Sequence, residues 1–270
     1  MKAASARAAA AESPEADAPE LAPSRTFAVG FLAMVPLLVA YEWAVLAEPD
    51  SPRNSVVLLA ERALAPAGEH VVHVRWALLG LVALVCAFLA LRRGASIVGG
   101  LSRILIEGLL AACVLGPVMV VLVRSLPQFL PQLELSEERV PPGLVETALV
   151  FGAAAWEELF FRVGLYSFLY WLALRFVLSF DASERLARFV ADATGLVLSS
   201  LAFAAAHFAP VLRLLGPGGR PFDAALFTWL ACGGALLGLL FRLRGPGVAA
   251  WTHGLFNVAL WVGVDPDVIW

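Results

Sequence analysis

The feature that most constrains this chain is a succession of long apolar segments with very few charged residues. Among its 270 residues, 60% are hydrophobic and only 15% are Asp, Glu, Lys or Arg, against about 25% in ordinary soluble domains. An apolar stretch of about 20 residues crosses a bilayer as a helix, which satisfies its own backbone hydrogen bonds. We therefore predict an all-α, polytopic helical membrane protein.

The apolar segments predict seven or eight membrane spans. They cover residues 27–47, 74–91, 101–124, 143–180, 189–212, 221–243 and 247–264. As one helix, the segment 143–180 would be about 57 Å long, nearly twice the roughly 30 Å of a hydrocarbon core. It is either two spans hinged near residues 157–164 or one span with a long extension. The length favours two spans, and we predict about eight transmembrane helices.

The rest of the composition bounds the domain organisation and the partners. Residues 1–24 are rich in Ala, Pro and acidic residues and predict a disordered tail, followed by a single membrane domain at 25–270. Arg92 and Arg93 follow the second span and favour a cytoplasmic loop there, which places the N-terminus in the cytoplasm. After residue 143 the basic residues give no consistent orientation. The net charge of −3, without a long basic run, gives nucleic-acid binding no support.

A short set of polar residues interrupts the apolar segments of the C-terminal half. Its members are Glu157, Glu158, Arg162, His207, Asp223, His253 and Asn257. Ionisable residues inside a membrane are costly and usually functional. Three pairs are spaced four residues apart and share a helix face: Glu158 with Arg162, Phe203 with His207, and His253 with Asn257. We expect these faces to meet around a small wet cavity inside the C-terminal bundle.

Helical geometry separates the two glutamates. Glu158 can form an ion pair with Arg162 one turn away, whereas Glu157 is rotated by about 100° and can point into the bundle. Asp223 follows "GPGGRPF" at a helix start and is expected to cap that helix. These assignments leave Glu157 as the candidate for chemistry.

The available chemistry is that of peptide hydrolysis by activated water. A carboxylate in a partly dry pocket can act as a general base, a nearby histidine can hold the water, and a second histidine with an asparagine can stabilise an oxyanion. Ser199 and Ser200 lie near His207, but no GxSxG motif is present. A zinc site made of Glu157, His207 and His253 is an open alternative, although the compact HExxH spacing is absent.

Each motif also has an ordinary structural interpretation. Glu157 and Glu158 can belong to a solvated helix end, and His207 can be a core histidine bonded to a backbone carbonyl. His253 and Asn257 can join helices by hydrogen bonds. The occurrence of all three motifs in successive apolar segments favours a functional site.

Three short stretches carry a family resemblance. "EELFFR", "FAAAH" and "HGLFN" resemble the EExxxR, FxxxH and HxxxN signatures of the CAAX protease and bacteriocin-processing family, which includes the Rce1-like glutamic-type intramembrane proteases. The resemblance covers a protease-like core at about residues 143–262, and residues 1–125 carry no motif. It implies that Glu157 activates water with His207 as its partner. It implies that His253 and Asn257 stabilise the oxyanion without any cofactor. Supporting residues would be Glu158, Arg162 and Phe203.

The resemblance implies an intramembrane endopeptidase that cleaves a membrane-anchored protein or peptide within the lipid bilayer. The bias towards Ala, Leu, Arg, Gly and Pro suggests a GC-rich bacterial genome, which places the chain in a bacterial inner membrane. Because bacteria generally lack protein prenylation, a C-terminal sorting tail is a better expected substrate than a prenylated protein. Two alternatives remain: a non-catalytic immunity or membrane-assembly factor of the same fold, and a proton-coupled transporter.

Overall fold

The computed structural model describes residues 27–51, 53–125, 143–214 and 220–263, so the predicted tail at 1–24 lies outside the described residues. The described parts are helical apart from turns and an isolated bridge between Phe208 and Arg220. The helices are α1 (Phe27–Ala47), α2 (Ser55–Ala63), η2 (Ala65–His70), α3 (Val71–Arg92), α4 (Ile97–Ser125), α5 (Leu144–Glu157), η3 (Glu158–Tyr166), α6 (Ser167–Leu178), α7 (Glu184–Ala205), α8 (Ala209–Leu212), α9 (Ala224–Arg244) and α10 (Pro246–Gly263). The predicted all-α fold class is confirmed.

Six helices in the described residues are long and apolar enough to cross a membrane. They are Phe27–Ala47, Ala65–Arg92, Ile97–Met119, Leu144–Leu178, Glu184–Ala205 and Ala224–Arg244. The protein is thus a polytopic helical membrane protein, whereas the count of eight spans is not confirmed. The segment that favoured the higher count forms a single helical run of 35 residues, in which a π-helical segment takes the place of the expected hinge.

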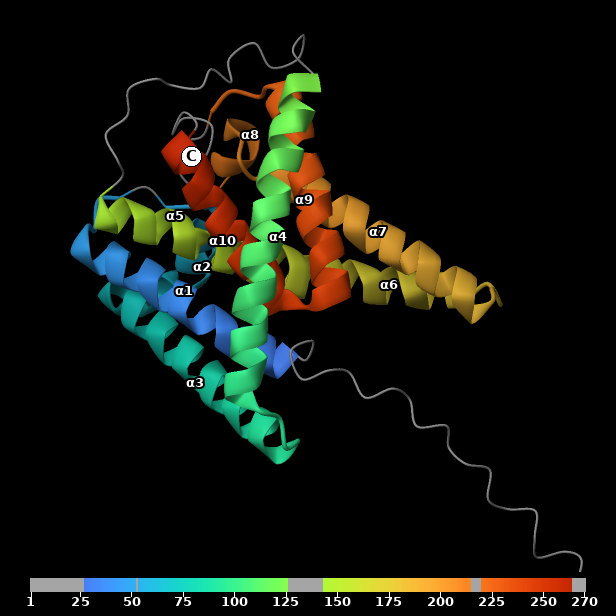
Figure 1. Ribbon diagram of the computed structural model, residues 1–270, viewed down its shortest axis with the longest axis horizontal. Helices are drawn as coiled ribbons and strands as arrows, with labels where there is room; N and C mark the ends of the chain where they lie inside the picture. The colour runs from blue at the N-terminus through green and yellow to red at the C-terminus, as the bar shows by residue number, and fades with distance from the viewer. Residues whose placement is uncertain (1–26, 52, 126–142, 215–219, 264–270) are drawn as a thin grey trace, which may run out of the picture.

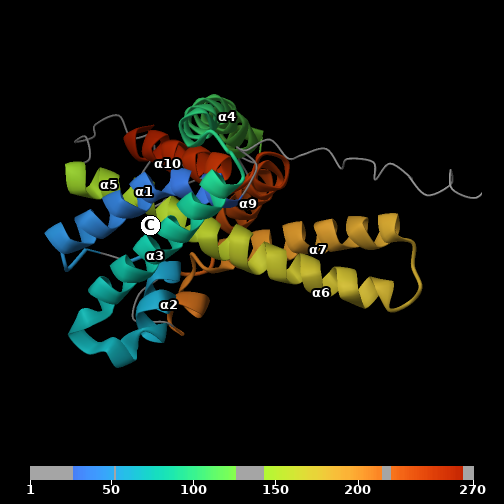
Figure 2. The same ribbon diagram turned by 90° about the horizontal axis from the view of Figure 1, so that it is seen from below.

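The helices form a compact bundle with one long hairpin attached. α1 packs against α3 and α5, and α10 packs against α4 and α5. α6 and α7 pack against each other as an antiparallel pair that projects beyond the other helices (Figures 1 and 2). The base of α7 also packs against α9. This arrangement brings the ends of α5 and α7 to the same region as the middle of α10.

The helix that carries the glutamates is held at close range from two sides. A Cβ atom on Gly152 of α5 would lie 2.5 Å from the backbone oxygen of Leu37 in α1. A Cβ atom on Gly254 of α10 would lie 2.8 Å from the Phe151 ring of α5. Real Cβ atoms do not approach other atoms so closely, so both contacts require glycine. α5 is therefore fixed between α1 and α10, which sets the position of its C-terminal end.

Candidate active site

The two glutamates lie at the change from α5 to the π-helical segment η3. Glu157 is the last residue of α5, and Glu158 is the first residue of η3. π-Helical turns are rare and occur frequently at functional sites. Helical periodicity alone gives no sign of an i→i+5 turn, so the sequence did not predict this segment.

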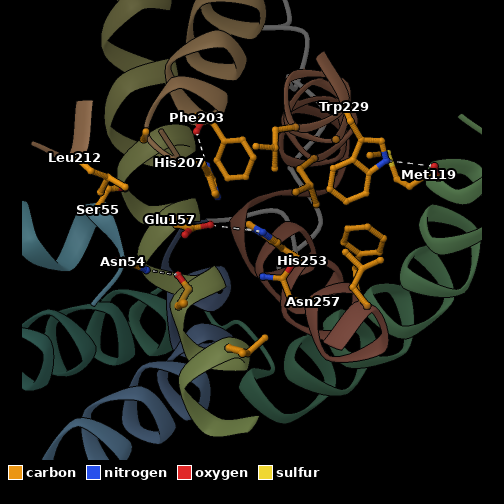
Figure 3. Close-up of a pocket in the computed structure, with 18 of the residues that line it drawn as sticks. Asn54, Ser55, Met119, Glu157, Phe203, His207, Leu212, Trp229, His253 and Asn257 are labelled. Carbon is orange, nitrogen blue, oxygen red and sulfur yellow. Dashed lines mark hydrogen bonds and ion pairs between the residues drawn. The ribbon is translucent and has the colours of Figure 1, made fainter. Parts of the chain in front are cut away.

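His253 of α10 lies between the two carboxylates. Its Nδ1 atom is 3.0 Å from Oε1 of Glu158, and its Nε2 atom is 3.6 Å from Oε2 of Glu157. The two ring nitrogens point in different directions, and the side chains of consecutive helical residues do so as well. Glu157 and Glu158 can therefore each approach a different nitrogen of the same imidazole. The family resemblance made His207 the partner of Glu157 on the attacking water, and that role stays a prediction. The carboxylate of Glu157 also faces His253, a contact that the motif spacing did not predict (Figure 3).

The predicted ion pair between Glu158 and Arg162 is confirmed. Oε2 of Glu158 lies 3.5 Å from Nε of Arg162, and both side chains are fully buried. Nη2 of Arg162 donates to the backbone oxygen of Gly234 at 3.1 Å, and its guanidinium lies 5.0 Å from the centre of the Phe203 ring. Burying two charges is costly unless they are paired, and here the ion pair offsets that cost although Oε2 of Glu158 and Nε and Nη1 of Arg162 make no hydrogen bond to the described residues. The pair therefore ties η3 to α9 and to α7.

His207 lies just beyond α7, which ends at Ala205 and is shorter than the predicted span 189–212. Its Nδ1 atom is 2.8 Å from the backbone oxygen of Phe203, and the two rings stack edge to face with centroids 4.9 Å apart. Burial lowers the pKa of His207, and nearby Glu157 opposes part of that effect. A neutral imidazole is therefore favoured, and Nδ1 is engaged, so Nε2 is the nitrogen left for a ligand or a water molecule.

These side chains line one cavity of about 110 Å³ (Figure 3). Because a water molecule needs only about 10–15 Å³ of such space, the cavity has room for several waters. Its lining includes five residues named from the sequence: Glu157, Phe203, His207, His253 and Asn257. Glu158 and Arg162 lie behind this wall, outside the lining. The arrangement separates a set of residues that face the cavity from an ion pair that supports it.

The cavity also contains residues that the sequence analysis missed. Arg53, Asn54 and Ser55 contribute the start of α2, Met119 contributes from α4, and Trp229 contributes from α9. "RNS" before an apolar run indicates a helix cap, but nothing local shows that this cap would lie beside Glu157. A long-range contact of this kind requires the fold.

Asp223 is a helix cap, as predicted. Its Oδ1 atom accepts a hydrogen bond of 2.7 Å from the backbone N–H of Leu226 at the start of α9. It does not line the cavity. The seven polar residues singled out in the sequence therefore divide between a cap, a buried ion pair and the cavity wall.

The zinc alternative meets a geometric difficulty. Within the described residues, no three His, Cys, Asp or Glu side chains are grouped so that they would hold a metal ion. Both ring nitrogens of His253 already face carboxylates, and Nδ1 of His207 faces a backbone carbonyl. The residues thus do not fit a preassembled His₂Glu site.

The comparison with protein families agrees with the motifs. Residues 141–259 match the family described as type II CAAX prenyl endopeptidase Rce1-like. The chain therefore carries an Rce1-like domain of the CAAX protease and bacteriocin-processing family, which confirms the resemblance of the three motifs. The match supports an intramembrane protease of the CAAX type in general, and the apolar helices indicate an integral membrane protein. Searches of curated proteins and of solved structures gave no match.

Proposed function

We propose that this protein is an intramembrane endopeptidase in which Glu157 activates the water that hydrolyses a peptide bond. The observation that carries the proposal is the cavity itself, where Glu157, His207, His253 and Asn257 converge inside an apolar bundle. The carboxylate of Glu157 is buried, with 9% of its side chain exposed, yet it faces space large enough for water. A buried base beside water is the arrangement that general-base hydrolysis requires.

In the proposed reaction, Glu157 takes a proton from a water molecule, and the water oxygen attacks the carbonyl carbon of the scissile bond. The carbonyl oxygen becomes an oxyanion, to which N–H groups of His253 and Asn257 donate. When the C–N bond breaks, the proton held by Glu157 passes to the leaving amine. The products are a carboxylic acid and an amine, and the carboxylate of Glu157 is restored.

Glu158 has a supporting role in this proposal because it orients the ring of His253 through Nδ1. A carboxylate only accepts hydrogen bonds, so Nδ1 of His253 is assigned the proton at the 3.0 Å contact with Glu158. Nε2 then faces the cavity side and Glu157. Donation to the oxyanion requires a proton on Nε2 as well, so the proposal has both ring nitrogens of His253 acting as donors when the oxyanion forms.

His207 is proposed to hold the attacking water through Nε2. The carbonyl of Phe203 engages Nδ1 and fixes the ring, and the Phe203 ring forms the wall beside it. Because burial favours the neutral imidazole, Nε2 can accept a hydrogen bond from water when Nδ1 carries the proton. This would orient the water between His207 and Glu157.

The proposed substrate is a membrane-anchored protein or peptide, such as a C-terminal sorting tail. The proposed location is a bacterial inner membrane with the N-terminus in the cytoplasm, as the arginines after the second span suggest. Labelling of single cysteines placed in the loop between α3 and α4, from either side of intact cells, tests this orientation. Labelling from the outside alone would contradict it.

The test of the reaction uses purified protein in proteoliposomes with a library of single-span peptides, and mass spectrometry to detect cleavage. Glu157→Gln keeps the size of the side chain and removes its basicity, so cleavage should be lost while the protein stays folded. Glu146→Gln is the matched control, because Glu146 lies exposed on the first turn of the same helix α5. Full cleavage by Glu157→Gln would exclude Glu157 as the base.

We also propose that hydrolysis needs no resident metal. Active protein should keep its rate after chelator treatment and dialysis, and metal analysis should find no stoichiometric zinc. Zinc that is lost together with activity, and restores activity when returned, would favour the His₂Glu alternative. A cellular phenotype that survives alanine at both His207 and His253 would instead favour a non-catalytic immunity or assembly role.

A further inference from the structure

The N-terminal half of the chain supplies one wall of the cavity. Arg53, Asn54 and Ser55, at the start of α2, line it together with the residues of the three motifs. They lie outside residues 141–259, so the Rce1-like domain alone does not enclose the site. Figure 3 shows Asn54 beside the helical turn that carries Glu157.

Asn54 joins α2 to that turn with both ends of its amide. Its Oδ1 atom accepts a hydrogen bond of 2.8 Å from the N–H of Val57 and so caps α2. Its Nδ2 atom donates to the backbone oxygen of Ala153 at 3.4 Å. Ala153 precedes Glu157 by four residues, so the same carbonyl is the helical acceptor for the N–H of Glu157. Asn54 thus bonds directly to the turn that ends with the proposed base.

A buried ionic cluster fixes α2 in this position. Arg75 of α3 donates to Glu42 of α1 at 2.7 Å and to Glu61 of α2 at 2.9 Å. The side chain of Arg75 is 2% exposed and that of Glu42 is fully buried, so water cannot take the place of either partner in this ion pair. The guanidinium of Arg75 also lies 5.9 Å from the centre of the ring of Trp156, which is the residue directly before Glu157 in the sequence. The turn is therefore held at Ala153 by Asn54 and contacted at Trp156 by Arg75.

We propose that Asn54 is a positioning residue for Glu157, and that the buried cluster around Arg75 keeps Asn54 in place. The inference rests on the proposed function of Glu157. It assigns Asn54 no contact with the reacting atoms: Asn54 fixes the helical turn so that the carboxylate points into the cavity. Positioning of this kind affects the rate of the chemical step more than the binding of substrate.

The test replaces Asn54 by Ser. Serine keeps an oxygen that caps α2 but is too short to reach the carbonyl of Ala153. We expect kcat to fall by about three- to tenfold, the effect of one hydrogen bond, while KM is unchanged. Asn54→Asp keeps the capping oxygen, lacks the N–H donor and sets a carboxylate oxygen against the carbonyl of Ala153, so kcat should fall at least as far. It also serves if the serine variant does not fold.

Ser183→Ala is the matched control. Ser183 accepts a hydrogen bond of 3.4 Å from the N–H of Leu186 and so caps α7, in the connection between α6 and α7. Figure 1 shows this connection at the outer end of the α6–α7 hairpin. Loss of this cap should lower stability by a similar amount and leave kcat of the folded enzyme unchanged. Equal loss of kcat in Ser183→Ala and Asn54→Ser would show that a general loss of stability accounts for the effect, and would overturn the proposal.

Hydrogen exchange gives a second measurement that does not depend on activity. In nanodiscs, Asn54→Ser should speed exchange of the amides at residues 150–158, whereas Ser183→Ala should leave them unchanged. Unchanged exchange in Asn54→Ser would overturn the inference even if the enzyme is active. If the wild-type protein cleaves no peptide, the proposed function fails, and the exchange result still decides whether Asn54 holds the turn.

Discussion

Replacing Arg162 by Met measures how strongly the buried ion pair holds the glutamate-bearing helix. Arg162 and Glu158 are both fully buried, so the substitution leaves the charge of Glu158 in the bundle with His253 as its remaining close partner. Removing one member of a buried pair costs about 3–5 kcal/mol. At about 2–4 °C per kcal/mol for a domain of this size, the melting temperature should fall by about 6–20 °C. The hydrogen bond to the oxygen of Gly234 is lost as well.

The double variant Glu158→Gln with Arg162→Met separates the ion pair from simple packing. The introduced glutamine side chain still accepts from Nδ1 of His253 but carries no charge, so the double variant should recover more than half of the lost stability. The assay is thermal unfolding of the purified protein in detergent micelles, followed by tryptophan fluorescence. A fall below about 2 °C for Arg162→Met, or strictly additive effects in the double variant, would refute the argument that the pair is coupled and buried.

Two further perturbations test the packing and the cavity. Gly152→Ala should lower the melting temperature by about 2–12 °C, because the new methyl group would lie 2.5 Å from the oxygen of Leu37 and overpacking costs about 1–3 kcal/mol. Gly116→Ala in α4 is its control, since the new Cβ atom would meet nothing within 4 Å. An equal fall in melting temperature for the two variants would contradict the close contact of Gly152 with α1. Asn257→Ala should reduce kcat by about 100- to 1,000-fold with little change in KM, measured with the peptide that the wild-type enzyme cleaves. A change confined to KM would remove Asn257 from oxyanion stabilisation.

The sequence was sufficient where the interaction is local. Glu158 and Arg162 are four residues apart on an apolar segment, and that spacing alone predicted their ion pair. Asp223 before an apolar run likewise predicted a cap. The convergence of the three motifs on one cavity followed from the cost of leaving polar groups in lipid. Each of these depends on helix geometry or on a strong energetic preference.

The sequence was insufficient where contacts join distant segments or where the helix departs from regularity. Asn54 and Ala153 are 99 residues apart, and no local signal links them. The predicted second span within 143–180 relied on helix length, but a helix can project beyond its neighbours, as α6 does together with α7 (Figure 2). The contact of Glu157 with His253 depends on where α10 crosses η3, which periodicity does not fix.

The ring of His253 gives two consecutive glutamates, Glu157 and Glu158, one common partner. An imidazole presents two nitrogens in opposite directions, and each nitrogen here faces one of two consecutive carboxylates. Glu158 is additionally paired with Arg162 and lies outside the cavity lining, as the proposed supporting role requires. Glu157 faces the cavity instead, where water can reach it. Two chemically identical neighbours thus acquire different environments, which is the condition under which a pair of carboxylates divides catalytic and structural work. The double substitution Phe161→Arg with Arg162→Phe moves the arginine one turn from Glu157 instead of Glu158 and leaves the net charge unchanged. It should therefore abolish peptide cleavage in proteoliposomes.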